Sequence, residues 1–251
     1  MRLSQKVALV TSSTSGICAN TARQLACEGA RVMICGRNAA QGRATVRQIR
    51  NGGGRASFTL ADIAVAADTK AAIDETIATY GRLDILFNHA SSSAARDGVL
   101  LEVSEATWDR MVETTLKGTF FCCQYALPFL QQSGSGTIIN LIEQLPADLM
   151  QSVAAVCQGG ILAMTGAIAQ QFSADAVTAN LIWVAKPTAD PPAVTADINL
   201  LMAQMVKGTD HSSGAAQPFT DIAEAVMYLA AGNSSLQGSA LIVTPSQPLT
   251  L

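Results

Sequence analysis

The sequence predicts an α/β fold, a single doubly wound parallel sheet with helices on both faces. Short apolar runs that indicate buried strands alternate along the chain with helical patterns of apolar residues. The strand runs are almost continuously apolar, which is typical of strands buried on both faces of a parallel sheet. Right-handed crossovers between such strands place helices on both faces.

The first part of the chain supplies four strands and three helices. A helix that carries Ile17, Thr21 and Leu25 follows the first strand and stops at Gly29. The second helix is polar and amphipathic, and the glycine run after Asn51 closes it. The strands are expected at 7–10, 31–35, 56–60 and 83–88, and the later two helices at 39–50 and 65–80.

The remainder supplies three helices and three strands. Pro128 lies near the end of the first of these helices, and Gly232 ends the last. The helices are expected at 105–131, 152–172 and 219–231, and the strands at 136–142, 177–184 and 240–243. No linker divides the chain, so residues 1–251 are expected to form one domain.

Composition narrows the function class. Only 14% of residues are charged, against about 25% in a typical soluble domain, which favours an oligomer that covers much of its surface. The net charge is -3 and no Lys/Arg cluster occurs, so we expect no nucleic-acid partner. We expect no membrane span or signal peptide, a cytoplasmic location, six reduced cysteines and no metal site.

Several segments in order resemble the short-chain dehydrogenase/reductase family along the whole chain. They are Leu83–Asn88 (LDILFN), Trp108–Phe120 (WDRMVETTLKGTF), Gly160–Ala169 and Asp221–Ala230. The resemblance implies a Rossmann-like fold, a dinucleotide cofactor, and a substrate lid at roughly 185–218.

The cofactor loop departs from the family pattern. Where the family has Thr-Gly-x-x-x-Gly-x-Gly, the segment Thr11–Cys18 keeps only the middle glycine. Glycines there permit a tight turn and close approach of the backbone to a pyrophosphate, and we expect Ser12 and Cys18 to block that approach. Strand two ends at Arg37 without an acid for the ribose, which would favour a phosphorylated ribose. The vestigial cofactor positions are Gly16, Asp62 and Asn88, and we expect no cofactor in this chain.

The family's catalytic residues are also replaced. A Tyr acts there as the acid/base, and a Lys four residues later lowers its pKa. The three tyrosines, Tyr80, Tyr125 and Tyr228, have no lysine four residues on, so the chain contains no Tyr-x-x-x-Lys. Alignment gives Ala154 at the Tyr position, Gln158 at the Lys position, Ile142 or Glu143 at the Ser position and Thr115 at the Asn position.

Three other polar residues lie in or near the expected cleft. Glu143 is either a new acid/base or a carboxylate that faces solvent or pairs with a neighbour, and no second partner group is evident. We interpret His89 as a structural turn residue and His211 as a solvent-facing loop residue.

These features predict a chain that is no enzyme on its own. We expect a non-catalytic subunit in a heterotetramer with a catalytically intact paralogue, which carries NAD, joined through helices 105–131 and 152–172. The resemblance extends to the two-subunit dehydrogenases of anaerobic toluene degradation, which implies oxidation of 2-(α-hydroxybenzyl)succinyl-CoA to benzoylsuccinyl-CoA. The alternatives are a stand-alone non-redox isomerase or cyclase that uses Glu143, and a ligand-sensing regulator.

Overall fold

A seven-stranded parallel sheet forms the centre of the molecule, in a computed structural model that describes residues 1–12, 16–89, 100–143, 152–184, 221–232 and 236–243. The strand order is β3-β2-β1-β4-β5-β6-β7. The strands are β1 (Val7–Val10), β2 (Arg31–Gly36), β3 (Arg55–Leu60), β4 (Ile85–His89), β5 (Gly136–Glu143), β6 (Val177–Val184) and β7 (Ala240–Val243). The predicted fold class, a single doubly wound parallel sheet, is confirmed.

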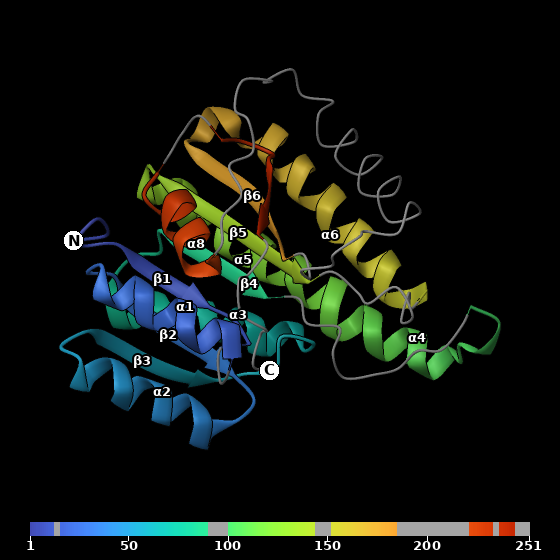
Figure 1. The fold of residues 1–251 in the computed structure, drawn as a ribbon, viewed down its shortest axis with the longest axis horizontal. Coiled ribbons are helices and arrows are strands. Elements are labelled where there is room, and N and C mark those ends of the chain that lie inside the picture. The colour runs from blue at the N-terminus through green and yellow to red at the C-terminus, as the bar shows by residue number, and fades with distance from the viewer. Residues whose placement is uncertain (13–15, 90–99, 144–151, 185–220, 233–235, 244–251) are drawn as a thin grey trace.

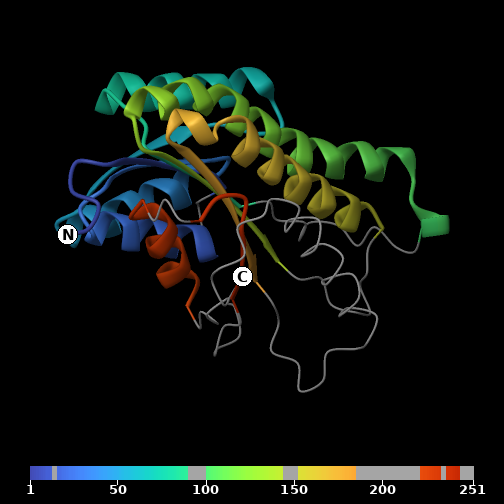
Figure 2. The same cartoon turned by 90° about the horizontal axis from the view of Figure 1, so that it is seen from above.

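Helices cover both faces of the sheet (Figures 1 and 2). One layer holds α1 (Gly16–Cys27), α2 (Ala39–Asn51) and α8 (Ile222–Ala230). The other holds α3 (Ala66–Tyr80), α5 (Gly118–Ser133) and α6 (Ser152–Gln171). The described residues also form two short 3-10 helices, Leu100–Glu102 and Ser173–Asp175, and the helical segments that directly precede α5.

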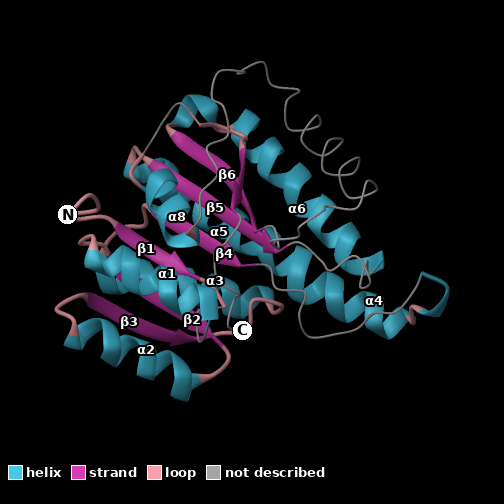
Figure 3. Cartoon of the chain, in the orientation of Figure 1, coloured by secondary structure: helices cyan, strands magenta, loops and turns pink. Residues whose placement is uncertain are grey.

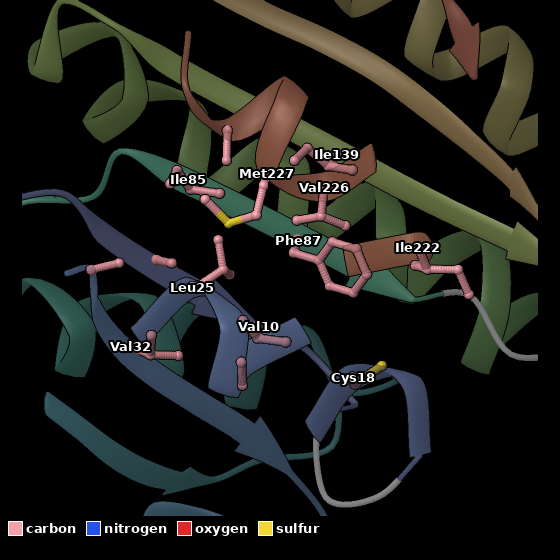
Figure 4. Close-up of a cluster of buried hydrophobic side chains, with 14 of the residues drawn as sticks. Val10, Cys18, Leu25, Val32, Ile85, Phe87, Ile139, Ile222, Val226 and Met227 are labelled. Atoms are coloured by element: carbon pink, nitrogen blue, oxygen red, sulfur yellow. The ribbon is translucent and has the colours of Figure 1, made fainter. Parts of the chain in front are cut away.

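Successive strand residues face opposite layers, as the pleat requires. Val10 and Phe87 pack under α1 and α8, whereas Leu9 and Leu86 pack under α3 and α5. Figure 4 shows the first of these clusters, with Cys18 at its edge in the first turn of α1. Both faces of β1 and β4 are therefore buried, which explains why their sequences are almost entirely apolar.

Local signals fix several helix ends. The side chain of Asn38 accepts a hydrogen bond from the backbone N–H of Gln41 at 3.1 Å and caps the start of α2. Gly81 ends α3 and Gly134 ends α5, with φ of 80° and 73°, in the left-handed conformation that glycine adopts without strain. The observed bounds of most helices and strands lie within a few residues of the expected ones, because such local signals set the helix ends.

The long helix expected at 105–131 is interrupted. It consists of α4 (Glu105–Met111), a π-helical segment η2 (Val112–Lys117) and α5. The hydroxyl of Thr119 donates to the backbone oxygen of Thr115 at 2.7 Å within this stretch. Single π turns often mark functional positions, and Thr115 occupies the position aligned with the family's Asn.

One described helix, Val153–Gln171, is long and apolar enough by length and composition to span a membrane. Sequence inspection alone did not single it out. Half of it is buried, and it packs on β5, β6 and η2, which is the environment of a core helix. The expected lid at 185–218, which includes His211, lies outside the described residues.

Candidate functional site

The candidate site lies at the carboxyl edge of the sheet, where β1, β4 and β5 end side by side. All strands point the same way in Figure 3, so their carboxyl ends gather at one edge. The chain places β2 and β3 on one side of β1 and then crosses back to place β4 on the other side. The strand order therefore changes direction between β1 and β4. Ligands of open α/β sheets bind at this switch point.

A buried polar network holds the strand ends in place. The side-chain amide of Asn88 donates to Asn140 Oδ1 at 3.0 Å, and the amide of Asn140 donates to Thr165 Oγ1 at 2.9 Å. The hydroxyl of Thr11 donates to Asn88 Oδ1 at 3.2 Å. These bonds join β1, β4, β5 and α6, and so they fix the position of His89, the last residue of β4.

Beside this network, Cys18, His89 and Glu143 form a continuous chain of side chains. His89 Nδ1 lies 3.1 Å from Cys18 Sγ, and His89 Nε2 lies 2.7 Å from Glu143 Oε1. The three residues come from the first turn of α1, the end of β4 and the end of β5. Cys18 is 1% exposed and His89 is 9% exposed, while the Glu143 side chain is 23% exposed. Glu143 is therefore the end of the chain that is open to solvent.

The arrangement supplies the partner group that was not evident for Glu143 from the sequence. His89, interpreted from the sequence as a structural turn residue, is the last residue of β4. The two side chains hydrogen bond to each other, and His89 also contacts Cys18. Glu143 pairs with a neighbour, which is one of the two readings left open from the sequence.

The charges around His89 favour its protonated form. Burial alone would lower the pKa of His89, but the charges and hydrogen bonds of Cys18 and Glu143 outweigh it and raise the pKa to about 10. An imidazolium donates from both ring nitrogens, which matches the two contacts.

The positions aligned with the family's Tyr, Lys and Asn are all buried. Ala154 is fully buried in a cluster with Met111, Val153 and Cys157. Gln158 donates from Nε2 to the backbone oxygen of Glu143 at 2.8 Å. Gln158 thus sits next to Glu143 and supports the end of β5, whereas Thr115 lies in η2.

The remaining family positions of the cofactor site lie in the turn after β1 and at the carboxyl ends of β2 and β3. Ser12 adopts a φ of 54° and Gly16 a φ of 59°, so Ser12 takes the left-handed conformation despite its Cβ. Arg37 Nη1 lies 3.7 Å from Asp62 Oδ2 at the carboxyl ends of β2 and β3. This pair leaves Arg37 largely exposed, where an anionic group can reach it.

A model of the short chain dehydrogenase family matches residues 6–186. The chain belongs to this family. The short-chain reductase protein NovJ of Streptomyces niveus is 32% identical over 97% of this chain and 94% of the relative. A (2S)-[(R)-hydroxy(phenyl)methyl]succinyl-CoA dehydrogenase subunit of Thauera aromatica is 33% identical over 72% of this chain and 73% of that subunit.

Solved structures of short-chain dehydrogenases share the fold. A short-chain dehydrogenase/reductase from Burkholderia xenovorans superposes with a TM-score of 0.78 at 26% identity, over 97% of this chain and 96% of that chain. An actinorhodin polyketide ketoreductase variant with NADPH gives a TM-score of 0.77 at 26% identity, over 97% of each chain.

Family membership overturns the expectation that the chain is no enzyme on its own. The relatives are reductases and dehydrogenases, so the family points to an oxidoreductase. That expectation rested on Ala154 and Gln158 at the Tyr and Lys positions. Replacing these side chains removes one proton relay, and Cys18, His89 and Glu143 remain in hydrogen-bonded contact at the same sheet edge.

The residues of the cleft fit only part of a dinucleotide. Arg37 and Asp62 lie where short-chain dehydrogenases hold the adenosine end, and they fit that group. At the pyrophosphate turn, Cys18 stands where the family pattern has its last glycine, and Ala154 and Gln158 stand at the Tyr and Lys positions. A thiol side chain at that turn fits a pyrophosphate less well than a glycine does.

Sequence reasoning missed the contact between Cys18, His89 and Glu143. The residues are separated by 71 and 54 positions, so no spacing motif reveals them. A signal was present nonetheless, because His89 and Glu143 directly follow the predicted strands 83–88 and 136–142, and Cys18 lies in the first turn of the helix after strand 7–10. Strands one, four and five are neighbours in this family's sheet, so their ends must meet.

Proposed function

We propose that this chain is a subunit of an oxidoreductase complex, built with a second short-chain dehydrogenase that carries the dinucleotide and the Tyr–Lys pair. The observation that carries the proposal is the fully buried Ala154 at the Tyr position, next to a Gln158 that bonds to backbone. Hydride transfer needs a positioned cofactor and a proton relay, and we propose that the two subunits form the active oxidoreductase together.

The exposed helix surface supports an assembly. A stripe of small residues runs along α6 at four-residue spacing and is exposed or half-buried, consisting of Ala155, Gly159, Ala163 and Ala167. A Cβ at Gly159 would meet nothing within 4 Å, whereas a Cβ at Gly160 would strike Leu116. The stripe is therefore free for close approach by another helix, and Gly160 serves internal packing.

Large apolar side chains extend the same kind of surface onto the neighbouring helices. Trp108 of α4, Phe120 of α5 and Val156 of α6 are exposed. Exposed apolar groups of this size mark interaction surfaces more often than free surface. The proposed complex is a cytoplasmic heterotetramer of two such chains and two partners, joined through α4–α5 and α6.

The proposed substrate is a hydroxyacyl thioester. The support is the similarity to the Thauera aromatica subunit, whose name gives a substituted succinyl-CoA as the molecule oxidised. For the aromatic member of this class, the complex would oxidise 2-(α-hydroxybenzyl)succinyl-CoA to benzoylsuccinyl-CoA with NAD in the second subunit.

Affinity purification of the tagged chain from its native organism tests this function. Mass spectrometry should find a second short-chain dehydrogenase with an intact Tyr-x-x-x-Lys, in about equal amount. The purified complex should reduce NAD with the hydroxyacyl thioester, and a Tyr→Phe substitution in the second subunit should abolish it. Recovery of this chain alone, with full NAD-dependent activity, would refute the proposal.

A further inference from the structure

The candidate site contains a nucleophile, a base and an acidic residue in hydrogen-bonded order, and the proposed oxidoreductase function uses none of them. Nucleophilic cysteines are recognised by a histidine within hydrogen-bond reach that is oriented by a third group. Here the thiol contacts Nδ1 of His89 and the carboxylate of Glu143 holds Nε2.

We propose that Cys18, His89 and Glu143 form a nucleophilic triad that accepts an acyl group from a small reactive ester or thioester. Cys18 is the nucleophile and His89 the acid/base. Glu143 is a positioning residue that orients the imidazole of His89 and neutralises its charge.

The placement of Cys18 supports this role. Cys18 lies in the first turn of α1, a helix of 12 residues whose N-terminal end carries a partial positive charge. Its sulfur lies 3.1 Å from His89 Nδ1, and a histidine beside the sulfur is one of the environments found at reactive cysteines in enzymes.

The location also suits a substrate. The three residues meet at the carboxyl edge of β1, β4 and β5, which is the switch point of the sheet. The solvent-exposed end is Glu143, and Gln158 holds the backbone beside it. We propose that an acyl donor approaches from the side of Glu143, which is the most exposed of the three side chains.

The chemistry balances without a redox step. The thiolate attacks the carbonyl carbon, the S–C bond forms, and the bond to the leaving alkoxide or thiolate breaks. The leaving group takes the proton from His89 Nδ1. Water then adds to the acyl-cysteine, His89 accepts its proton, and the Cys18 thiolate departs from the free acid.

Acylation of the full chain by p-nitrophenyl acetate tests the proposal. The expected result is a burst of about one p-nitrophenolate per chain, followed by slower turnover, with the acetyl group on the peptide that contains Cys18. Cys18→Ser should reduce the burst rate at least ~100-fold. Cys27→Ser is the matched control, because Cys27 is exposed at the other end of α1, and it should leave the burst unchanged.

The role of Glu143 has its own readout. Acylation needs protonated His89, whose raised pKa depends on Cys18 from α1 and Glu143 from β5. Glu143→Gln should slow the burst at least ~10-fold and move the alkaline limb of its pH profile to lower pH. A purely structural role would leave the position of that limb unchanged.

A second measurement needs no variant. Limited alkylation of the wild-type chain by iodoacetamide should modify Cys18 faster than the exposed Cys27 at neutral pH. The proposal is overturned if Cys18 stays unmodified by both reagents, or if Cys18→Ser retains the burst. Neither assay involves a second subunit or NAD. Failure of this proposal would therefore not count against the proposed oxidoreductase complex, which is tested separately.

Discussion

Cys18, His89 and Glu143 contact one another at the carboxyl edge of the sheet, where we propose that they act together. Two of them, Cys18 and His89, replace residues of the family's cofactor-binding turns, and Glu143 stands at or beside its Ser position. Each replacement considered alone suggests decay of a site. Their contacts at 3.1 Å and 2.7 Å form a new arrangement of groups. A single substitution is therefore a poor guide to function until its neighbours are known.

We predict that His89 stays protonated through neutral pH. Its pKa of about 10 lies above the ordinary value of 6.5 because Cys18 and Glu143 outweigh the effect of burial. Glu143→Gln should lower this pKa by about 1 to 3 on the pH scale. NMR titration of the imidazole signals measures it, with His89→Gln assigning the signal against His211. A wild-type His89 signal that titrates near pH 6.5 would contradict the geometry.

The same shift has a consequence for stability. A histidine whose pKa is higher in the folded chain contributes stability fully below pH 6.5, and that contribution is lost as the pH rises towards 10. The partner groups on either side of the ring are Cys18 and Glu143. His89 therefore helps to hold α1 against the ends of β4 and β5 at neutral pH.

Restoring the family's proton relay in this chain should fail. The double variant Ala154→Tyr, Gln158→Lys places a phenol where a fully buried alanine packs against Met111, Val153 and Cys157. Overpacking of this kind costs about 1–3 kcal/mol, and the cofactor end of the cleft stays filled by Cys18. We expect no NAD reduction by this variant without a partner. Clear turnover would show that the nicotinamide site is intact.

At the scale of elements, the sequence predicts most of the fold. Strand positions follow from apolar runs, and helix ends follow from caps such as Asn38 and stops such as Gly81. The π-helical segment Val112–Lys117 escapes prediction, because its residues have ordinary helical preferences. Tertiary packing of η2 against α6 decides its geometry.

Helix α6 illustrates a second limit. Its sequence is apolar or small all round, so periodicity does not reveal which side faces the sheet. The structure separates the side of the buried Ala154 and of Gly160, which packs against Leu116, from the exposed or half-buried stripe of Ala155, Gly159, Ala163 and Ala167. Of the two sides, only the stripe of Ala155, Gly159, Ala163 and Ala167 is available to a partner helix.

A charge in this stripe should disrupt assembly without unfolding the chain. Ala163→Glu places a carboxylate on the exposed face of α6, where a partner helix would bury it uncompensated, at a cost of several kcal/mol. We expect at least ~100-fold weaker association with the second subunit. Ala78→Glu is the control, because Ala78 is exposed on α3, away from the proposed interface. Equal association of both variants would place the interface elsewhere.

At the scale of the whole molecule, the sheet order brings together residues far apart in sequence. The predicted fold class was sufficient to place β1, β4 and β5 side by side. It did not give the side-chain contacts, because these depend on the local turn that carries Cys18 and on the buried Asn88–Asn140 network.

We predict that the isolated chain binds NAD and NADP only weakly. Cys18 replaces the last glycine of the pyrophosphate turn, and we expect it to limit the binding energy to contacts with Arg37 and Asp62. Calorimetry should give dissociation constants above ~1 mM for both dinucleotides. Any residual preference should favour NADP, since Arg37 is exposed and suits a phosphorylated ribose. Low micromolar affinity for either dinucleotide would be incompatible with this cleft.

The central claim is that the chain works in a complex with a second family member. Light scattering on the chain expressed alone and together with that short-chain dehydrogenase tests it most directly. The account predicts a co-expressed particle close to four times the mass of one 26.1 kDa chain, with both chains in equal amount. A soluble, well-folded monomer or homo-oligomer that ignores the second chain would contradict it.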